Sequence, residues 1–513
     1  MPQHQTVLIL DFGGQYTQLI ARRVREHGVY CEIYPFDAAI EKIEERRPIG
    51  LILSGGPESV FADGAPRADP RLYDLGIPTL AICYGMQLIA QDLGGKVEKA
   101  ERREYGRAEI DVATAGTVFD GLHRREQVWM SHSDRIVEAP AGFAITAWSA
   151  NAPMVAFEHP GKKIYGVQFH PEVSHTRSGA AMLSNFLRQA CQARGDWQIA
   201  SFVDETVASI RRRVGSDRVI CAVSGGVDSS VMAALIQRAI GDQLVAVFVD
   251  NGLLRLGEAQ QVTRALREGL GLKVVAVDAR RDFLGALAGV TDPEVKRSII
   301  GRTFIEVFER TAASLEGVRF LAQGTLYPDV IESVSVNGPS ATIKTHHNVG
   351  GLPEKLDFEL VEPLRFLFKD EVRALGRQLD LPPALIGRHP FPGPGLAVRI
   401  LGEVDAERVA MLQAADDVFI SELRAADLYD RVSQALAVLL PVKSVGVMGD
   451  ERTYDHVVAL RSVDTEDFMT ADWSRLPYDL LGKVANRIVN EVRGVNRVVY
   501  DVTSKPPGTI EWE

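Results

Sequence analysis

The chain has 513 residues, of which 46% are hydrophobic and 24% are charged, and its formal net charge is −11. This length and composition are typical of a globular enzyme with about two to four domains. The acidic balance argues against a nucleic-acid partner, whose binding surface would normally carry a basic stripe. The polar first residues and the lack of any apolar run of about eighteen residues predict neither export nor a membrane partner.

The cysteines point to a reducing compartment. The chain has four, spaced far apart and without C-x-x-C spacing: Cys31, Cys83, Cys191 and Cys221. Such spacing argues against a disulfide framework or a zinc site. We therefore expect a cytoplasmic protein.

Four apolar runs in the first 195 residues predict buried strands, with helical patterns between several of them. The runs are Thr6–Leu10, Ile49–Leu53, Thr79–Cys83 and Ile164–Phe169. Strands that alternate with helices predict a doubly wound parallel sheet. Such sheets gather their reactive groups at the carboxyl ends of the strands.

Two of these strand ends carry candidate catalytic residues. Cys83 has small residues two positions before and after it, which permits a sharp turn that presents the sulfur. The start of a helix also lowers the pKa of a thiol there. After the last strand, His170 is placed to act as the base, and Glu172 to orient its imidazole. Backbone N–H groups of Tyr84 and of Gly56 are candidates for an oxyanion hole.

Each piece alone has a plainer explanation, since a cysteine after a strand is more often a core residue. Together and in this order they strongly resemble a class I glutamine amidotransferase. The resemblance implies that Cys83 attacks the side-chain amide of glutamine and releases ammonia. It also implies that Ser131-His132-Ser133-Asp134 binds the backbone part of glutamine. Ala81 stands where this family often has Gly, which is a small change.

A glycine- and serine-rich turn follows the apolar run Val219–Val223 and opens directly into a helical pattern. Such a turn directs backbone N–H groups and the helix dipole at one point, which suits phosphate. The pattern S-G-G-x-D-S resembles the pyrophosphate loop of the ATP pyrophosphatase family, and neither G-x-x-x-x-G-K-[ST] nor G-x-G-x-x-G occurs. The resemblance implies binding of ATP and its pyrophosphate by Ser224, Gly225, Gly226, Val227, Asp228, Ser229 and Ser230.

The region up to residue 388 reads as a second parallel α/β unit, with further strands predicted at Leu244–Val249, Lys273–Val277 and Arg319–Ala322. An ATP-cleaving site requires Mg²⁺ between the phosphates. The candidate Mg²⁺ ligands are Asp228, Asp329 and Glu332. The glycine-rich segment Ile343–Pro353 predicts a lid, in which Lys344 supplies countercharge to the triphosphate.

The last region begins at a stretch dense in proline and glycine, after Arg388. A helical stripe over Leu412–Leu423, strands at Ser444–Val447 and His456–Leu460, and a helix over Asp479–Val492 predict a small α+β unit. Its apolar stripes fit either a core or an oligomer contact, and we expect a homodimer through this unit. The predicted domains are therefore 1–198 (amidotransferase), 199–388 (ATP pyrophosphatase) and 389–513 (acceptor binding and dimerisation).

The tail, 498–513, is apolar, stiffened by proline and rich in polar groups. It closely resembles the terminus of the glutamine-hydrolysing GMP synthetase family, as do the predicted lid and His389–Leu396. The resemblance implies xanthosine 5′-monophosphate (XMP) as the acceptor, with ATP and glutamine as the other substrates. It assigns acceptor binding to Arg297, Lys505, Thr509 and Glu511.

Three other functions remain as alternatives. Another glutamine-dependent ligase with the same loop, forming NAD or asparagine, would use a different amidase or lack this tail. A tRNA-modifying enzyme of the loop family would need a basic surface and a second catalytic cysteine. A non-catalytic binding protein would have no need of both motif sets.

Overall fold

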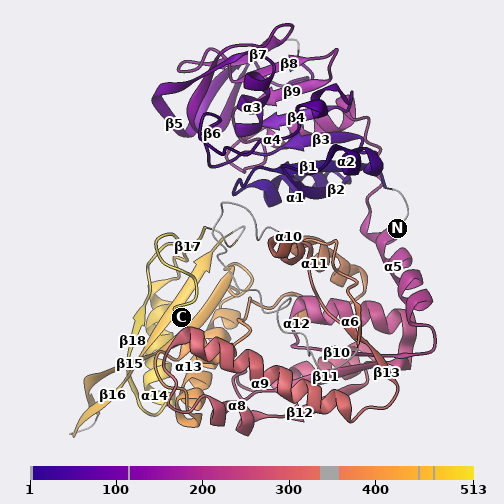
Figure 1. The fold of residues 1–513 in the computed structure, drawn as a ribbon. Helices are drawn as coiled ribbons and strands as arrows, with labels where there is room; N and C mark the ends of the chain where they lie inside the picture. Colours follow the sequence, from indigo (N-terminus) through magenta and orange to yellow (C-terminus); the bar gives the residue numbers. More distant parts are fainter. Residues whose placement is uncertain (1–3, 114–115, 335–357, 449–450, 466–467, 469) are drawn as a thin grey trace. The chain divides into compact units, whose positions relative to one another are not determined.

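The computed structural model describes residues 4–513 except 114–115, 335–357, 449–450, 466–467 and 469 (Figure 1). The predicted lid and its Lys344 lie outside the described residues. The chain divides into two compact units, the first running to Glu205 and the second formed mainly by residues from Thr206 onward. None of the described helices is long and apolar enough to cross a membrane.

A nine-stranded sheet forms the centre of the first unit, in the order β2-β1-β3-β4-β9-β8-β7-β5-β6. Its parallel half contains all four predicted strands, which are thereby confirmed. The confirmed strands are β1 (Thr6–Asp11), β3 (Gly50–Leu53), β4 (Thr79–Ile82) and β9 (Ile164–Val167), and β2 (Tyr30–Pro35), which was not predicted, completes this half. Around them lie α1 (Thr17–Glu26), α2 (Ile40–Arg46), α3 (Tyr84–Asp92) and α4 (Gly179–Asn185). Helix α1 packs against α4, and α3 packs against β4, β5 and β6.

The antiparallel half of this sheet was not predicted from the sequence. It consists of β5 (Lys96–Val112), β6 (Arg125–Glu138), β7 (Ala144–Ser149) and β8 (Ala156–His159). In β6 every second side chain is buried, as in a strand with one covered face. However, three of its inward positions hold Glu126, His132 and Asp134, so hydrophobicity does not follow the period of two.

The second unit contains a five-stranded parallel sheet in the order β12-β11-β10-β13-β14. The four predicted strands are confirmed as β10 (Arg218–Ala222), β11 (Leu244–Asp250), β12 (Val274–Asp278) and β13 (Val318–Ala322), and β14 (Glu359–Val361) adds a short edge. The helices of this part are α6 (Val227–Ile240), α7 (Glu258–Arg264), α8 (Arg280–Ala286), α9 (Pro293–Ala313), α10 (Tyr327–Val334), α11 (Lys369–Gln378) and α12 (Pro383–Ile386). Helix α5 (Ile199–Val214) precedes them and runs from the first unit into the second.

The C-terminal part carries a four-stranded sheet of β15 (Gln434–Met448), β16 (Glu451–Asp464), β17 (Asp472–Trp473) and β18 (Val495–Tyr500). Its helices are α13 (Ala406–Ala425) and α14 (Tyr478–Glu491), as predicted. The strands β15 and β16 are much longer than their predicted pieces. The residues Ala435–Leu439 are buried on both faces, and such a run has no alternation that would distinguish strand from helix.

The hydrophobic core of the second unit is continuous from β10 and β11 through α9 to α13, β15, β16 and α14. The predicted division at residue 388 therefore lies within one continuous core, and the three domain boundaries stay predictions. The α/β fold class, with two parallel sheets and a C-terminal α+β part, is confirmed.

Candidate active sites

Cys83 lies in a strained turn between β4 and α3. Its φ is +52° and its ψ is −106°, a conformation that non-glycine residues rarely adopt. Two residues on, a Cβ at Gly85 would lie 2.7 Å from the carbonyl oxygen of Leu53, so the turn tolerates no side chain there. The local chain therefore has the geometry of a nucleophile elbow, with a thiol at the start of a helix.

His170 and Glu172 form a buried pair beside this thiol. The Nδ1 atom of His170 lies 2.7 Å from Oε1 of Glu172, and both side chains are almost fully buried. Burial lowers the pKa of His170, but the Glu172 carboxylate and a hydrogen bond with Cys83 outweigh it and raise that pKa well above its usual value. An imidazolium held next to a thiol favours the thiolate, which is the nucleophilic form.

The Gly55-Gly56 turn approaches the elbow closely. A Cβ on Gly55 would lie 3.2 Å from Cε1 of His170, and one on Gly56 would lie 2.9 Å from the carbonyl oxygen of Phe12. Only a backbone without side chains fits here, so the turn can approach the elbow closely. The Tyr84 N–H belongs to the first turn of α3, where amide groups have no acceptor within the helix. Gly56 and Tyr84 therefore border the elbow, and their role as oxyanion donors stays a prediction.

The strand β6 runs past the nucleophile at Ser131–Asp134. The Sγ atom of Cys83 lies 3.7 Å from the carbonyl oxygen of Ser131. The side-chain amide of Gln87 donates to the carbonyl of Asp134 at 3.0 Å, and that of Gln168 lies 3.6 Å from Sγ of Cys83. The sequence analysis did not identify these two glutamines. The position of Gln87, four residues after Cys83 on one helix, was the available signal.

The loop 224–230 precedes α6 and has the shape of a phosphate cradle. Gly225 has a φ of +75°, and a Cβ there would collide with Val262 of α7. The hydroxyl of Ser229 bonds the Ser224 N–H at 3.2 Å and the Gly226 carbonyl at 3.1 Å, which fixes the loop from within. The loop therefore lies at the N-terminus of α6, where the positive end of the helix dipole favours a bound phosphate.

Asp228 lies in the first turn of α6, and only one of its two carboxylate oxygens is available to bind a metal ion. One of its carboxylate oxygens contacts the ammonium of Lys369, while the other is buried without a hydrogen-bond partner. Asp329 caps α10 by accepting the Leu326 N–H at 2.9 Å, and the side chain of Glu332 is not described. The described residues contain no group of three potential metal-binding side chains. Since Mg²⁺ in ATP sites takes most of its ligands from phosphates and water, one or two carboxylates suffice.

Two basic residues near the loop were missed, because neither stands in a recognisable motif. Lys369 begins α11 and contacts Asp228. Arg388 donates to the carbonyl of Gly225 at 3.0 Å and contacts the carboxylate of Glu258. These residues add positive charge to the loop from segments more than a hundred residues away in sequence.

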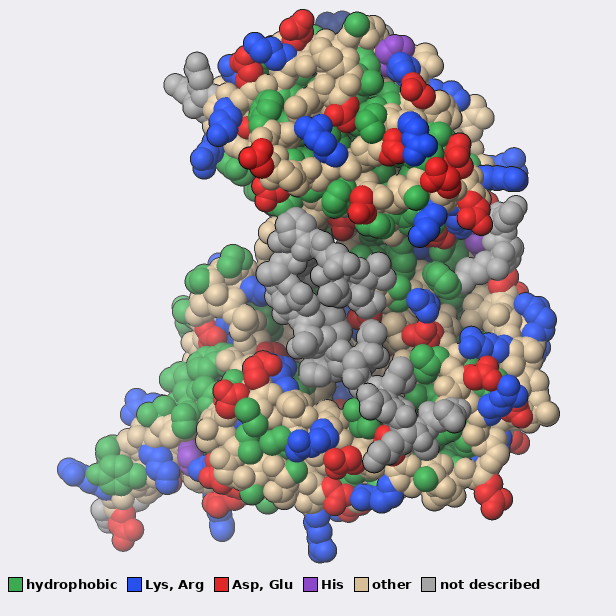
Figure 2. Space-filling model, viewed as in Figure 1, with side chains coloured by type: hydrophobic (Ala, Val, Ile, Leu, Met, Phe, Trp, Pro, Cys, Tyr) green, Lys and Arg blue, Asp and Glu red, His purple; other side chains and the backbone are tan. Residues whose placement is uncertain are grey.

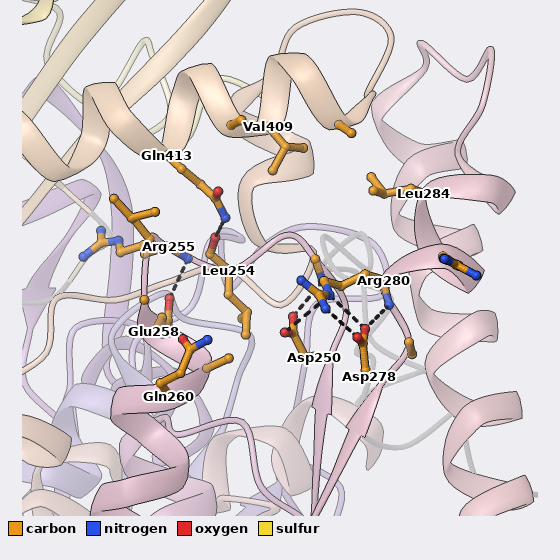
Figure 3. Close-up of a pocket in the computed structure, with 18 of the residues that line it drawn as sticks. Asp250, Leu254, Arg255, Glu258, Gln260, Asp278, Arg280, Leu284, Val409 and Gln413 are labelled. Atoms are coloured by element: carbon orange, nitrogen blue, oxygen red, sulfur yellow. Dashed lines mark hydrogen bonds and ion pairs between the residues drawn. The ribbon is translucent and has the colours of Figure 1, made fainter. Parts of the chain in front are cut away.

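A pocket of about 810 Å³ opens at the carboxyl ends of β11 and β12 (Figure 3). Arg280 links two of its carboxylates, since it donates to Asp278 at 2.8 Å and lies 3.9 Å from Asp250. On the opposite wall, Gln413 of α13 donates to the carbonyl of Leu254 at 2.6 Å. The pocket includes Glu258, so Arg388 connects it with the pyrophosphate loop.

The tail is packed in place by three fully buried cations. Arg461 donates to the carbonyls of Thr503, Thr509 and Ile510 and to the carboxylate of Asp501. Arg399 holds Glu511 through two hydrogen bonds of 2.8 and 3.0 Å. Lys296 binds the carboxylate of Glu513 at 2.5 Å.

The four predicted acceptor residues all contact the tail or belong to it. Arg297 donates to the main-chain oxygen of Glu513 at 2.6 Å, and Lys505 donates to the carbonyl of Phe468 at 2.7 Å. Thr509 and Glu511 line a second pocket of about 500 Å³. The structure thus describes all four residues, and their role in acceptor binding stays a prediction.

Family comparisons agree with these two reactive centres. The class-I glutamine amidotransferase family matches residues 8–190, the NAD synthase family matches 198–292, and the GMP synthase C terminal domain matches 421–512. A glutamine amidotransferase from Thermotoga maritima is similar in structure, with 18% identity, a TM-score of 0.30, and coverage of 37% of this chain and 99% of its own. Amidotransferase and ATP-cleaving parts in one chain define a glutamine-dependent ligase.

Full-length relatives identify which ligase family this is. The glutamine-hydrolysing GMP synthase of Phenylobacterium zucineum (strain HLK1) is 59% identical over 514 residues, which cover 99% of both chains. That of Aquifex aeolicus (strain VF5) is 57% identical over 511 residues and covers 100% of both. The chain belongs to the glutamine-hydrolysing GMP synthase family, as the resemblance in the sequence indicated.

Replacement of Glu172, the carboxylate that orients the base, should impair glutamine hydrolysis and leave ammonia-driven synthesis unaffected. In Glu172→Gln the His170 imidazolium loses its main electrostatic support, so its pKa falls and the alkaline limit of glutamine hydrolysis moves to lower pH. By analogy with other triads, the rate should fall by about 10³–10⁴-fold. Glutamate release measured against pH tests this, with ammonia-driven GMP synthesis as the control. An unchanged pH profile would contradict the assignment.

Proposed function

We propose that this protein forms GMP, AMP, pyrophosphate and glutamate from XMP, ATP, glutamine and water. The observation that carries this proposal is the presence of two reactive centres in one chain. One is the Cys83 elbow with its His170–Glu172 pair, and the other is the loop 224–230 at the edge of a parallel sheet. The ordered tail supplies a third element, for the acceptor nucleotide.

In the first half-reaction the Cys83 thiolate attacks the side-chain amide carbon of glutamine. The N–H groups of Tyr84 and Gly56 stabilise the oxyanion, and His170 gives its proton to the departing ammonia. Water then cleaves the thioester, which yields glutamate and restores the thiol. The raised pKa of His170 supports this course, because the proton needed by the leaving group is already in place.

In the second half-reaction the C2 oxygen of xanthine attacks the α-phosphorus of ATP, and pyrophosphate leaves. The loop amides, Lys369 and Arg388 would hold the departing phosphates. Mg²⁺ held by Asp228 and by the other predicted ligands, Asp329 and Glu332, would neutralise phosphate charge. Ammonia then displaces AMP from the adenylated purine. Bulk water would protonate ammonia and remove its nucleophilicity, so we propose that it travels enclosed.

The pocket in Figure 3 is our candidate for the nucleoside part of ATP. It lies at the carboxyl edge of the sheet that bears the loop, where ligands of open α/β sheets bind. Its carboxylates Asp250 and Asp278 suit ribose hydroxyls, since carboxylates accept hydrogen bonds from them.

A second candidate function is another ligase of the same loop family, because the NAD synthase family matches residues 198–292. The C-terminal match and the tail favour XMP as the acceptor. Pyrophosphate release with a panel of acceptors distinguishes the two.

We further propose a cytoplasmic location, supported by the four free cysteines among the described residues and by the thiol chemistry of Cys83. A homodimer through the C-terminal part is supported by an exposed apolar ribbon of β15 and β16 (Figure 2). Its exposed side chains are Val442, Val445, Val447 and Tyr454.

Loss of the nucleophile should leave the synthetic centre intact. Cys83→Ala should lower glutamine-driven GMP formation by more than about 10³-fold and retain formation from ammonium salts at raised pH. Asp228→Ala should remove both routes, because no adenylate forms without metal and loop. Chromatographic measurement of GMP, AMP and glutamate tests both. If folded Cys83→Ala lost both routes as well, the two centres would not be separable.

The tail prediction concerns affinity for the acceptor. Lys505→Ala should weaken XMP binding by about tenfold or more, the usual loss for one charged hydrogen bond, and leave ATP binding unchanged. Isothermal titration calorimetry with each nucleotide measures this. Lys273→Ala, an exposed lysine before β12, is the matched control. Unchanged XMP affinity in Lys505→Ala would indicate that Lys505 has only a structural role.

The dimer prediction concerns the β15–β16 ribbon. Val447 is 73% exposed, so Val447→Lys should shift the protein from dimer toward monomer without affecting the fold. Sedimentation velocity gives the mass. Tyr478→Ser on α14, an equally exposed position outside the ribbon, should remain dimeric. A monomeric wild type would contradict the proposal.

A further inference from the structure

A second buried His–Glu pair lies near the elbow, and the chemistry above does not use it. Glu104 of β5 and His132 of β6 are direct cross-strand partners. The Nε2 atom of His132 lies 3.1 Å from Oε2 of Glu104, and the two side chains are only 2% and 8% exposed. Apart from this contact, neither atom has a hydrogen-bond partner among the described residues.

The other atoms of the pair are already engaged. Nδ1 of His132 lies 2.9 Å from the carbonyl oxygen of Asp134, so Nδ1 must carry a hydrogen and donate it. Oε1 of Glu104 accepts from the side-chain amide of Asn151 at 2.9 Å. Nε2 and Oε2 therefore face each other as two acceptors unless one proton lies between them. The geometry requires that the pair share a single proton.

The charges around the pair act on that proton in opposite directions. The pKa of the His132 imidazole is lowered from its usual value, mainly by burial, and the Glu104 carboxylate offsets this effect only in part. Loss of the shared proton would leave a buried net negative charge, which is costly in this interior. The nearby His170 also lowers the pKa of His132. Cys83 lies beside Ser131, and the carboxylate of Asp134 accepts a hydrogen bond from Ser59.

His132 stands between the residues that face the nucleophile. Ser131, immediately before it, has its carbonyl 3.7 Å from Sγ of Cys83. Asp134, two residues on, takes bonds from both His132 and Gln87 of α3 through its carbonyl. Displacement of the His132 ring would therefore move the backbone that borders the thiol.

We propose that the Glu104–His132 pair is a positioning element for glutamine, which holds the Ser131–Asp134 backbone beside Cys83 by means of one shared proton. This inference rests on the proposed glutaminase function. It predicts that glutamine binding weakens as the pH rises and the pair loses its proton. The ammonia-driven reaction does not use this segment and is not affected.

The experiment compares Glu104→Ala with Glu104→Gln in the full-length enzyme. Glu104→Ala should raise KM for glutamine by about tenfold or more and leave ammonia-driven synthesis unchanged. In Glu104→Gln the amide can donate to His132 without a titrating proton, while its oxygen still accepts from Asn151. That variant should restore KM relative to Glu104→Ala and remove the increase of KM with pH that is expected for the wild type. Glu98→Gln, an exposed position on β5, is the matched control.

Parallel loss of glutamine-driven and ammonia-driven synthesis in Glu104→Ala would overturn the proposal, because it would indicate general unfolding. A Glu104→Gln enzyme with the same KM as Glu104→Ala, or with the pH dependence of the wild type, would overturn it too. Failure of the proposed function itself is distinguishable, since the wild type would then form no GMP from glutamine, XMP and ATP.

Discussion

Both reactive centres depend on a buried parallel strand that turns directly into a helix. At β4–α3 the turn is a single residue, Cys83, and at β10–α6 it is the loop that contains Gly225. Each turn requires a positive φ, and each places a reactive or ligand-binding group at the positive end of a helix dipole. The difference lies in the residue that takes the unusual conformation. A cysteine in that conformation presents its sulfur to the site, whereas a glycine presents only backbone amides.

These turns could be predicted from the sequence because their determinants are local. Small residues flank Cys83, and the S-G-G-x-D-S pattern lies between an apolar run and a helical one. By contrast, β5 to β8 were missed, since inward-facing Glu126, His132 and Asp134 conceal the alternation of β6. Lys369 and Arg388 reach the loop from distant segments, and no local pattern indicates such contacts. The Glu104–His132 pair likewise depends on the register of two strands.

The tail illustrates how long-range charge pairing determines order. Termini are usually mobile, and a buried cation is costly unless it is fully paired. Here Lys296, Arg399 and Arg461 are all fully buried, and each bonds to the tail. The dependence is mutual: without the tail these three charges would be stranded in the core. Ordering of the tail is therefore part of the folding of the second unit, which keeps the candidate acceptor residues in fixed positions.

The charge state of His170 bears on where glutamine hydrolysis is controlled. Glu172 and Cys83 raise the pKa of His170, which favours the imidazolium and with it the thiolate form of the nucleophile. The triad itself thus favours the reactive form, without a contribution from other parts of the chain. Control must then act on the alignment of the substrate amide with the sulfur and the oxyanion donors, since small displacements there cost much of the rate. In the inference above, the backbone of β6 beside Cys83 sets that alignment, and Gln87 and His132 hold it through the carbonyl of Asp134.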